Sequence, residues 1–282
     1  NTFSEDGTTS LGSLSFTEDG TIAAYAISEG GSDWRKVIVM DVLTKEIMED
    51  TLVDIKFSGL SWKGNEGFFY SSYDKPIGSE LSAKTDQHKL YFHKLGTSQS
   101  EDEVVYGASP EQKRRYVGGS VSKDGRFLFI TGANSTSGNE LSVMDLSNED
   151  GEIIPMVEGF DQDANVLHVK DDTFYIITNL DAPNKRLVKT SFEAPTTENW
   201  KDVIPETAHV LSVSKGAGYF FAQYMVDALS EVKQYDFEGK LIRNIDLPGI
   251  GTASGFGGKE DDEVLYYSFT NYILPSTIFE FN

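Results

Sequence analysis

The sequence predicts an all-β protein in which one structural unit is used six times. Short segments with alternating apolar and polar residues recur along the whole chain, and most of them run into a polar turn that contains glycine. Helical periodicity is nearly absent from the 282 residues. In the clearest copy, SVSKDGRFLFITG at 120–132, an alternating strand reaches an Asp-Gly turn and an apolar strand follows, which is typical of a β-hairpin.

The other copies repeat this order of elements. Their first two strands are expected within 13–28, 59–74, 168–179, 212–224 and 255–270. A third strand is expected in each copy, at 36–42, 89–95, 140–146, 186–192, 231–237 and 276–281. A weaker fourth strand closes most copies, at 102–107, 151–157 and 240–247. The polar insertion at 74–87 in the second copy is expected to be a surface loop.

Four short strands repeated every 42–60 residues, roughly, are typical of the blades of a β-propeller. A lone blade cannot bury its faces, so neighbouring blades bury them, which explains why the second strands are apolar on both sides. We expect residues 1–282 to form about five complete four-stranded blades and a partial one. A ring with a fractional blade leaves open sheet edges, which favours further blade material at both ends. The expected blades are 11–52, 53–110, 111–160, 161–207, 208–248 and, for the partial blade, 249–282.

The composition is that of an acidic globular protein, with 39% hydrophobic and 24% charged residues. The formal net charge of −21 repels nucleic-acid phosphates and anionic lipid, so we expect neither nucleic acid nor a membrane as a partner. The chain has no cysteine, which excludes disulfides, thiol nucleophiles and cysteine-based zinc sites. The opening residues NTFSEDGTTS do not form a signal peptide, and because the first residue is not Met, a mature or trimmed chain is expected.

Motifs for catalysis and for cofactor binding are missing. No G-x-S-x-G occurs, and the Gly-rich run at 249–258 leads into a strand and not into a phosphate-binding helix. The calcium-like start at 161–165 lacks the glycine and the final glutamate of a calcium loop. We expect no metal, no cofactor and no catalytic residue in this chain. Structural roles are expected for the four histidines, His88, His93, His168 and His209.

The chain resembles the propeller of the prolyl oligopeptidases, a family of serine peptidases (family S9). The run HKLYFHKLGTSQSEDEVVY at 88–106 carries the likeness most strongly, and LGTSQSED at 95–102 is its most specific part. The likeness is closest to the bacterial branch. Further matching segments come in order and cover essentially the whole chain, at 28–34, 54–62, 67–74, 114–126, 183–189 and 266–281.

The resemblance implies a seven-bladed propeller that covers an α/β-hydrolase domain, which holds a Ser/Asp/His triad and cleaves short peptides after proline. This chain would correspond to blades two to six and most of blade seven, without the hydrolase domain. The resemblance therefore implies a non-catalytic part that gates and lines the substrate site, with short proline-containing peptides and the hydrolase domain of the same enzyme as partners. Because some bacterial members are exported, the resemblance implies a periplasmic or secreted location for this protein. The residues themselves do not exclude a cytoplasmic location.

Four substrate-binding residues follow from the resemblance alone. Phe57 matches a phenylalanine that lines the pocket beyond the proline, with a buried core aromatic as the alternative interpretation. Val117 stands where animal members have methionine, which keeps an apolar wall. Asn134 stands where those members have an arginine that reaches the peptide, so this charge is lost. Ser137 replaces a cysteine, and only a role in loop geometry is expected for it.

Two other functions stay open at this point. The chain could be a free-standing propeller that binds a peptide or a protein without catalysis, or a propeller enzyme of another type. The missing motifs disfavour the latter. A G-x-S-x-G followed by Asp and His in the residues encoded after Asn282 would separate the leading interpretation from the binding module.

Overall fold

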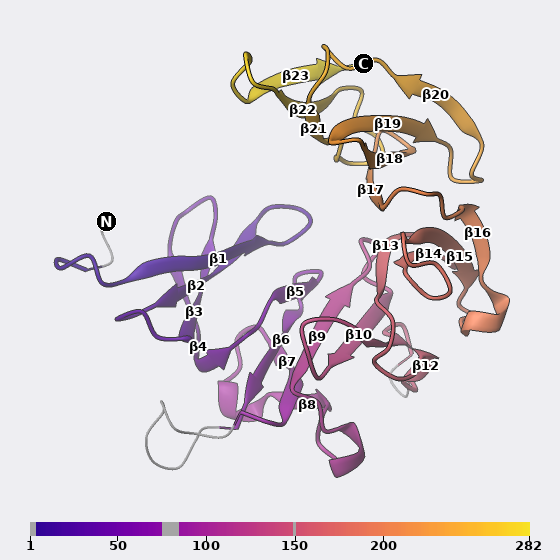
Figure 1. Ribbon diagram of the computed structural model, residues 1–282. Coiled ribbons are helices and arrows are strands. Elements are labelled where there is room, and N and C mark those ends of the chain that lie inside the picture. The colour runs from indigo at the N-terminus through magenta and orange to yellow at the C-terminus, as the bar shows by residue number, and fades with distance from the viewer. Residues whose placement is uncertain (1–3, 75–84, 149–150) are drawn as a thin grey trace. The chain divides into compact units, whose positions relative to one another are not determined.

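The computed structural model describes residues 4–74, 85–148 and 151–282 and divides into two compact units, 1–160 and 161–282 (Figure 1). Within the described residues the regular structure is β-strand, apart from three short 3₁₀ turns at Gln99–Glu101, Pro110–Gln112 and Thr197–Asn199. No helix in this part of the chain is long and apolar enough to cross a membrane.

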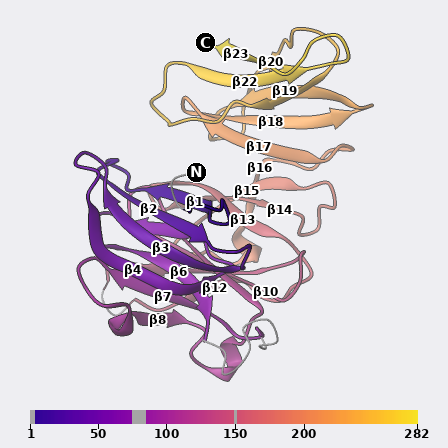
Figure 2. The same ribbon diagram turned by 90° about the vertical axis from the view of Figure 1, so that its left-hand side faces the viewer.

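The first unit contains three antiparallel sheets of four strands each, and the strands of each sheet lie side by side in chain order. Figure 2 shows this order for β1 to β4. The first sheet consists of β1 (Ser10–Phe16), β2 (Ile22–Ser28), β3 (Trp34–Asp41) and β4 (Ile47–Lys56). The second consists of β5 (Leu60–Lys63), β6 (Gly67–Tyr73), β7 (His88–Lys94) and β8 (Glu103–Tyr106). The third consists of β9 (Tyr116–Val121), β10 (Phe127–Ala133), β11 (Glu140–Asp145) and β12 (Ile154–Val157).

The second unit contains two sheets of four strands and one of three, again in chain order. The fourth sheet consists of β13 (Ala164–Lys170), β14 (Thr173–Thr178), β15 (Arg186–Ser191) and β16 (Lys201–Ile204). The fifth consists of β17 (Leu211–Gly216), β18 (Tyr219–Val226), β19 (Leu229–Tyr235) and β20 (Leu241–Ile245). The sixth consists of β21 (Thr252–Gly255), β22 (Leu265–Thr270) and β23 (Thr277–Phe281).

The Asp-Gly turns close hairpins, as the sequence predicts. The amide of Gly20 donates to the carbonyl of Thr17 at 2.9 Å in the β1–β2 turn, and the amide of Gly125 donates to Ser122 at 2.8 Å in the β9–β10 turn. In each turn the hydroxyl two residues before the Asp-Gly aspartate donates to that aspartate. Gly20 and Gly125 have φ near +70° to +80°, a region that glycine enters without steric cost.

The core lies between successive sheets within each unit. The side chains of β6 alternate: Phe68 and Tyr70 pack against the first sheet, and Phe69 packs with Leu90 and the third sheet. In the second unit, Phe220 packs against the fourth sheet while its neighbour Phe221 packs against the sixth. Because each second strand is buried on both faces, it needs apolar residues at consecutive positions.

The structure differs from the sequence-based expectations in two strands and in the end of the first blade. Two fourth strands that the sequence did not predict are present, β4 and β16. The expected end of the first blade at 52 falls inside β4, which continues to Lys56, and the blade ranges themselves stay a prediction. Most of the insertion at 74–87 lies outside the described residues, which omit 75–84.

Candidate functional site

Phe57 directly follows β4 and has two unusual properties. Its side chain is 49% exposed, so it is not the buried core aromatic of the alternative interpretation. Its φ is +55°, in the left-handed region that bulky residues rarely occupy. Strained backbone of this kind is found most often at functional sites, where the surrounding structure holds it in place.

The ring of Phe57 contacts two tyrosines from the second and third sheets. Its centroid lies 6.3 Å from that of Tyr73 at the end of β6 and 5.8 Å from that of Tyr116 at the start of β9, both in edge-on geometry. The ammonium group of Lys56 lies 5.1 Å from the centroids of Phe57 and Trp34. We call Phe57, Tyr73 and Tyr116 the aromatic wall, in which the half-exposed Phe57 follows the first sheet and the two tyrosines belong to the second and third sheets.

Val117 and His88 lie beneath this wall. The side chain of Val117 is 3% exposed and packs with Leu90, Leu128 and Ile130, so it supports the wall from the core. His88 is 1% exposed, and the amide of Val117 donates to its Nδ1 at 2.9 Å. Burial lowers the pKa of His88 below its ordinary value, so the imidazole is neutral at pH 7.

Asn134 and Ser137 lie in the exposed segment between β10 and β11. The side-chain oxygen of Asn134 accepts a hydrogen bond from the backbone amide of Arg115 at 3.1 Å, which connects this segment to the wall. Arg115 is exposed, and its guanidinium lies 5.4 Å from the centroid of Tyr116. An open depression of about 480 Å³ adjoins them, lined by Thr85, Asp86, Lys113, Arg115 and Asn134. Three of the four expected residues are therefore linked to one region, and Ser137 lies three positions beyond it.

The specific run at 95–102 builds a buried polar cluster between the first two sheets. His93 Nδ1 donates to Asp102 Oδ1 at 2.7 Å, and Nε2 donates to Asp50 Oδ1 on β4 at 3.2 Å. Asp50 also accepts from the amide of Gly96 at 2.6 Å, and Asp102 accepts from the hydroxyl of Tyr70 at 2.8 Å. Burial opposes a charge on His93, but the hydrogen bonds and the charges of Asp102 and Asp50 outweigh it and raise its pKa above the ordinary value.

Gln99, in the same run at 95–102, joins this run to the outer edge of β4. Its side-chain oxygen accepts from the amide of Val53 at 2.9 Å, and its side-chain nitrogen donates to the carbonyl of Val53 at 2.9 Å. The amide group thereby pairs with the free edge of β4 as a neighbouring strand would. Three residues of LGTSQSED, Gly96, Gln99 and Asp102, thus contact β4 or the histidine that donates to it.

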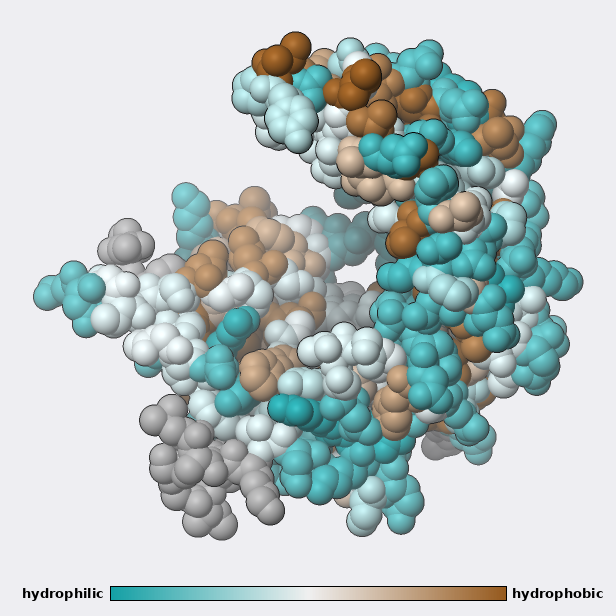
Figure 3. Space-filling model, in the orientation of Figure 1, coloured by the Kyte–Doolittle hydropathy of each residue, from teal (hydrophilic) through white to brown (hydrophobic). Residues whose placement is uncertain are grey.

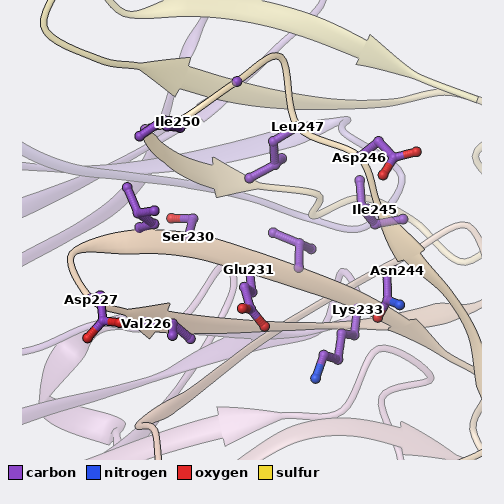
Figure 4. A pocket seen from close by; sticks show the side chains of 14 residues that line it. Val226, Asp227, Ser230, Glu231, Lys233, Asn244, Ile245, Asp246, Leu247 and Ile250 are labelled. Atoms are coloured by element: carbon purple, nitrogen blue, oxygen red, sulfur yellow. The ribbon is translucent and has the colours of Figure 1, made fainter.

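The second unit has a cavity of about 700 Å³ of a different character. It lies between the β18–β19 hairpin and the segment 244–251, and its lining mixes acidic, basic and apolar side chains, including Asp227, Glu231, Lys233 and Leu247 (Figure 4). None of the residues expected from the sequence lines it. Among the described residues, no group of three His, Asp or Glu side chains is placed to hold a metal ion.

Sequence reasoning missed Tyr73, Tyr116, Arg115 and His88 as members of this region. The matching segments 67–74 and 114–126 contain the two tyrosines and Arg115, but only the folded chain brings them to Phe57. Arg114, in the basic run at 113–116, forms an ion pair with Glu140 in which both side chains are less than one-fifth exposed.

Comparisons with known proteins give one consistent result. Residues 1–282 match the family model described as the prolyl oligopeptidase N-terminal β-propeller domain. The chain is 58% identical over 283 residues to a prolyl endopeptidase from Elizabethkingia meningoseptica and 28% identical over 331 residues to one from Dictyostelium discoideum. The alignments include 100% and 99% of this chain but only 40% and 43% of those relatives.

Solved structures agree with this result. A structure from a mechanistic study of two prolyl endopeptidases superposes with a TM-score of 0.87 at 32% identity, over 98% of this chain and 40% of that one. Prolyl oligopeptidase B from Galerina marginata, bound to a 35-residue substrate, superposes with a TM-score of 0.85 at 26% identity, over 100% of this chain and 41% of that one. The chain thus spans about two-fifths of the length of these relatives. Together with five four-stranded sheets and a three-stranded one in the described ranges, this confirms the predicted propeller fold class.

Proposed function

Because this chain belongs to the family of prolyl oligopeptidase N-terminal β-propeller domains, we propose that it is the non-catalytic, substrate-lining part of a serine peptidase that cleaves short peptides after proline. The match over residues 1–282 carries this proposal. In it, an α/β-hydrolase domain of the same protein is the partner that supplies the nucleophile, the general base and the oxyanion donors. Short proline-containing peptides are the substrates.

The aromatic wall is the part of this chain that meets the peptide in our proposal. A half-exposed phenylalanine held in a strained conformation supports this role, since nothing in core packing requires an exposed ring. Phe57 and Tyr116 present apolar faces to residues on the N-terminal side of the proline. Arg115, exposed beside Tyr116, supplies the positive charge that Asn134 lacks. Val117 supports the wall from beneath, and Ser137 shapes the loop.

Phe57→Ala in the full-length protein tests the wall. The expected result is that kcat/KM falls for peptides with three or more residues before the proline, by a factor that corresponds to about 1–3 kcal/mol of lost aromatic contact. Peptides with one residue before the proline should lose much less. The matched control is Phe16→Ala, because Phe16 is 50% exposed on β1 and lies outside the wall. Equal losses for both substrate lengths, or a loss in thermal stability alone, would overturn the assignment of Phe57.

A free-standing binding module is the second candidate, and the half-exposed Phe57 of the aromatic wall would also suit it. The two candidates differ in what the full-length protein does to a bound peptide. A peptidase releases fragments that end in proline, whereas a binding module returns the peptide intact, and mass spectrometry of the mixture distinguishes them.

A further inference from the structure

His88 contacts the peptide groups next to two rings of the aromatic wall, those of Phe57 and Tyr116. The amide of Val117, which belongs to the peptide group joining Tyr116 to Val117, donates to His88 Nδ1 at 2.9 Å. His88 Nε2 lies 2.9 Å from the carbonyl oxygen of Lys56, which belongs to the peptide group joining Lys56 to Phe57. One imidazole therefore connects the two peptide groups next to the rings that stand 5.8 Å apart.

These two contacts define the protonation state of the ring. A backbone amide can only donate, so Nδ1 must be the acceptor and carry no proton. A carbonyl oxygen can only accept, so Nε2 must carry the proton. His88 is consequently the neutral Nε2–H tautomer, and neither its cation nor the other tautomer can make both bonds.

The surroundings hold this ring in place. His88 begins β7, where its own amide donates to the carbonyl of Arg114 at 2.8 Å. Its ring lies against Tyr73, with the centroids 4.4 Å apart, and the hydroxyl of Tyr73 donates to the carbonyl of Arg115 at 2.5 Å. The imidazole thus joins the end of β4, the second sheet and the start of β9 in one hydrogen-bonded chain.

We propose that His88 is a positioning residue, which sets the separation of Phe57 and Tyr116. It thereby sets the selectivity of the site for peptides that extend on the N-terminal side of the proline. This inference rests on the proposed function of the wall. His88 itself is 1% exposed and does not meet the peptide. It acts through the Lys56–Phe57 peptide group, and it stabilises the left-handed conformation at Phe57, because that carbonyl direction is part of the conformation.

The test compares three substitutions in the full-length protein. His88→Phe keeps a planar ring and removes both hydrogen bonds. His88→Gln keeps one donor and one acceptor and should restore much of the function. His168→Phe is the matched control, because His168 is a buried histidine among aromatic rings in the other compact unit. The readout is the ratio of kcat/KM for a peptide with three residues before the proline to that for a peptide with one.

His88→Phe is expected to lower this ratio about fivefold or more, since one ordinary hydrogen bond corresponds to about that factor. The expected ratio for His88→Gln lies between His88→Phe and the unsubstituted protein, and His168→Phe should leave it unchanged. A purely structural role would lower stability without moving the ratio, or lower both kcat/KM values equally, and either result overturns the proposal. If His88→Phe does not fold, His88→Asn replaces it, because that amide is too short to reach both peptide groups.

A second readout is independent of catalysis. Imidazole nitrogen NMR of the histidine-labelled full-length protein, assigned with His88→Gln, should show the Nε2–H tautomer at pH 7. A protonated or Nδ1–H ring would overturn the placement of His88. If Phe57→Ala leaves the substrate ratio unchanged, the proposed function of the wall fails. The NMR signal then tests only the placement of His88 between the two peptide groups. The Nε2–H tautomer supports this placement, and a protonated or Nδ1–H ring overturns it.

Discussion

At Phe57 an unfavourable backbone conformation determines the position of the ring. A non-glycine residue in the left-handed region costs about 1–2 kcal/mol relative to a right-handed one. Phe57 has a φ of +55° and therefore carries this cost. Its ring lies half exposed between Lys56 and two tyrosines. The side chain gains little core packing there, which is why we assign it to peptide contact.

The strain at Phe57 predicts an order of stability for two variants. Phe57→Gly should be more stable than Phe57→Ala by about 1 kcal/mol, because glycine removes the steric cost and only part of this gain is lost to the more flexible unfolded chain. Both variants lack the ring and should lose the same selectivity for long peptides. Urea unfolding of the two full-length variants measures the difference. If the alanine variant is as stable as the glycine variant, the backbone at this position carries no strain.

The candidate site was only partly predictable at the residue scale. Phe57, Val117, Asn134 and Ser137 came from the resemblance and not from any local pattern. His88 could not be found from the sequence, because its hydrogen-bonding partners at 56 and 117 belong to two other sheets, the first and the third. A polar residue at the start of a strand can have many ordinary roles. Its particular role becomes evident only when the fold brings its hydrogen-bonding partners to it.

At the scale of elements, β4 shows why some strands escaped prediction. Its inward positions include Asp50, 3% exposed, which breaks the apolar alternation that signals a strand. This aspartate is compatible with a buried strand because it accepts hydrogen bonds from His93, 43 positions later in the chain, and from the amide of Gly96. β16 was missed for a simpler reason, since it has four residues and its first two are exposed. The second strands were predicted because they carry apolar runs, and the third strands because apolar and polar residues alternate along them.

The cluster of Asp50, His93 and Asp102 predicts a pH-dependent stability. Because the folded-state pKa of His93 is raised above its ordinary value of 6.5, the cluster contributes fully below that pH, and its contribution is lost as the pH rises through the folded-state value. The unfolding free energy should therefore decline above pH 6.5 more steeply than in His93→Gln. Urea unfolding of both proteins between pH 6 and 9 measures this difference.

His93→Leu provides the complementary test. It leaves two buried carboxylates without the ring that donates to both of them, so we expect a loss of about 3–5 kcal/mol at pH 7. A change within 1 kcal/mol, or parallel pH profiles for the unsubstituted protein and His93→Gln, would show that His93 is not charged in the folded state.

At the scale of the whole molecule, the first and last sheets each have one apolar face that no other sheet of their unit covers within the described residues. Leu14 and Phe16 on β1 pair with Tyr25 and Ala23, whose neighbours Ala24 and Ala26 face the second sheet, so Leu14 and Phe16 point the other way. Both are about half exposed, and Ile278 on β23 is 75% exposed. Apolar residues reach the surface over the first and the last sheets in Figure 3.

These faces predict self-association of the isolated 282-residue chain. Apolar surface of this kind is unfavourable in water, so we expect a concentration-dependent increase in mass. Leu14→Lys together with Phe16→Lys should reduce it. Leu43→Lys is the matched control, because Leu43 is 84% exposed in the β3–β4 turn, away from this face. Sedimentation equilibrium measures the mass, and a chain that stays monomeric at all concentrations would contradict the prediction.

The central claim is that this chain shapes the substrate site of a peptidase and does not perform the reaction. The most direct measurement is hydrolysis of a fluorogenic prolyl peptide by the purified 282-residue chain and, in parallel, by the full-length protein, each with and without a serine-directed phosphonate. We predict no turnover by the chain and phosphonate-sensitive turnover by the full-length protein. Turnover by the chain that survives purification and is blocked by the phosphonate would contradict the account, and so would a full-length protein that binds the peptide and leaves it intact.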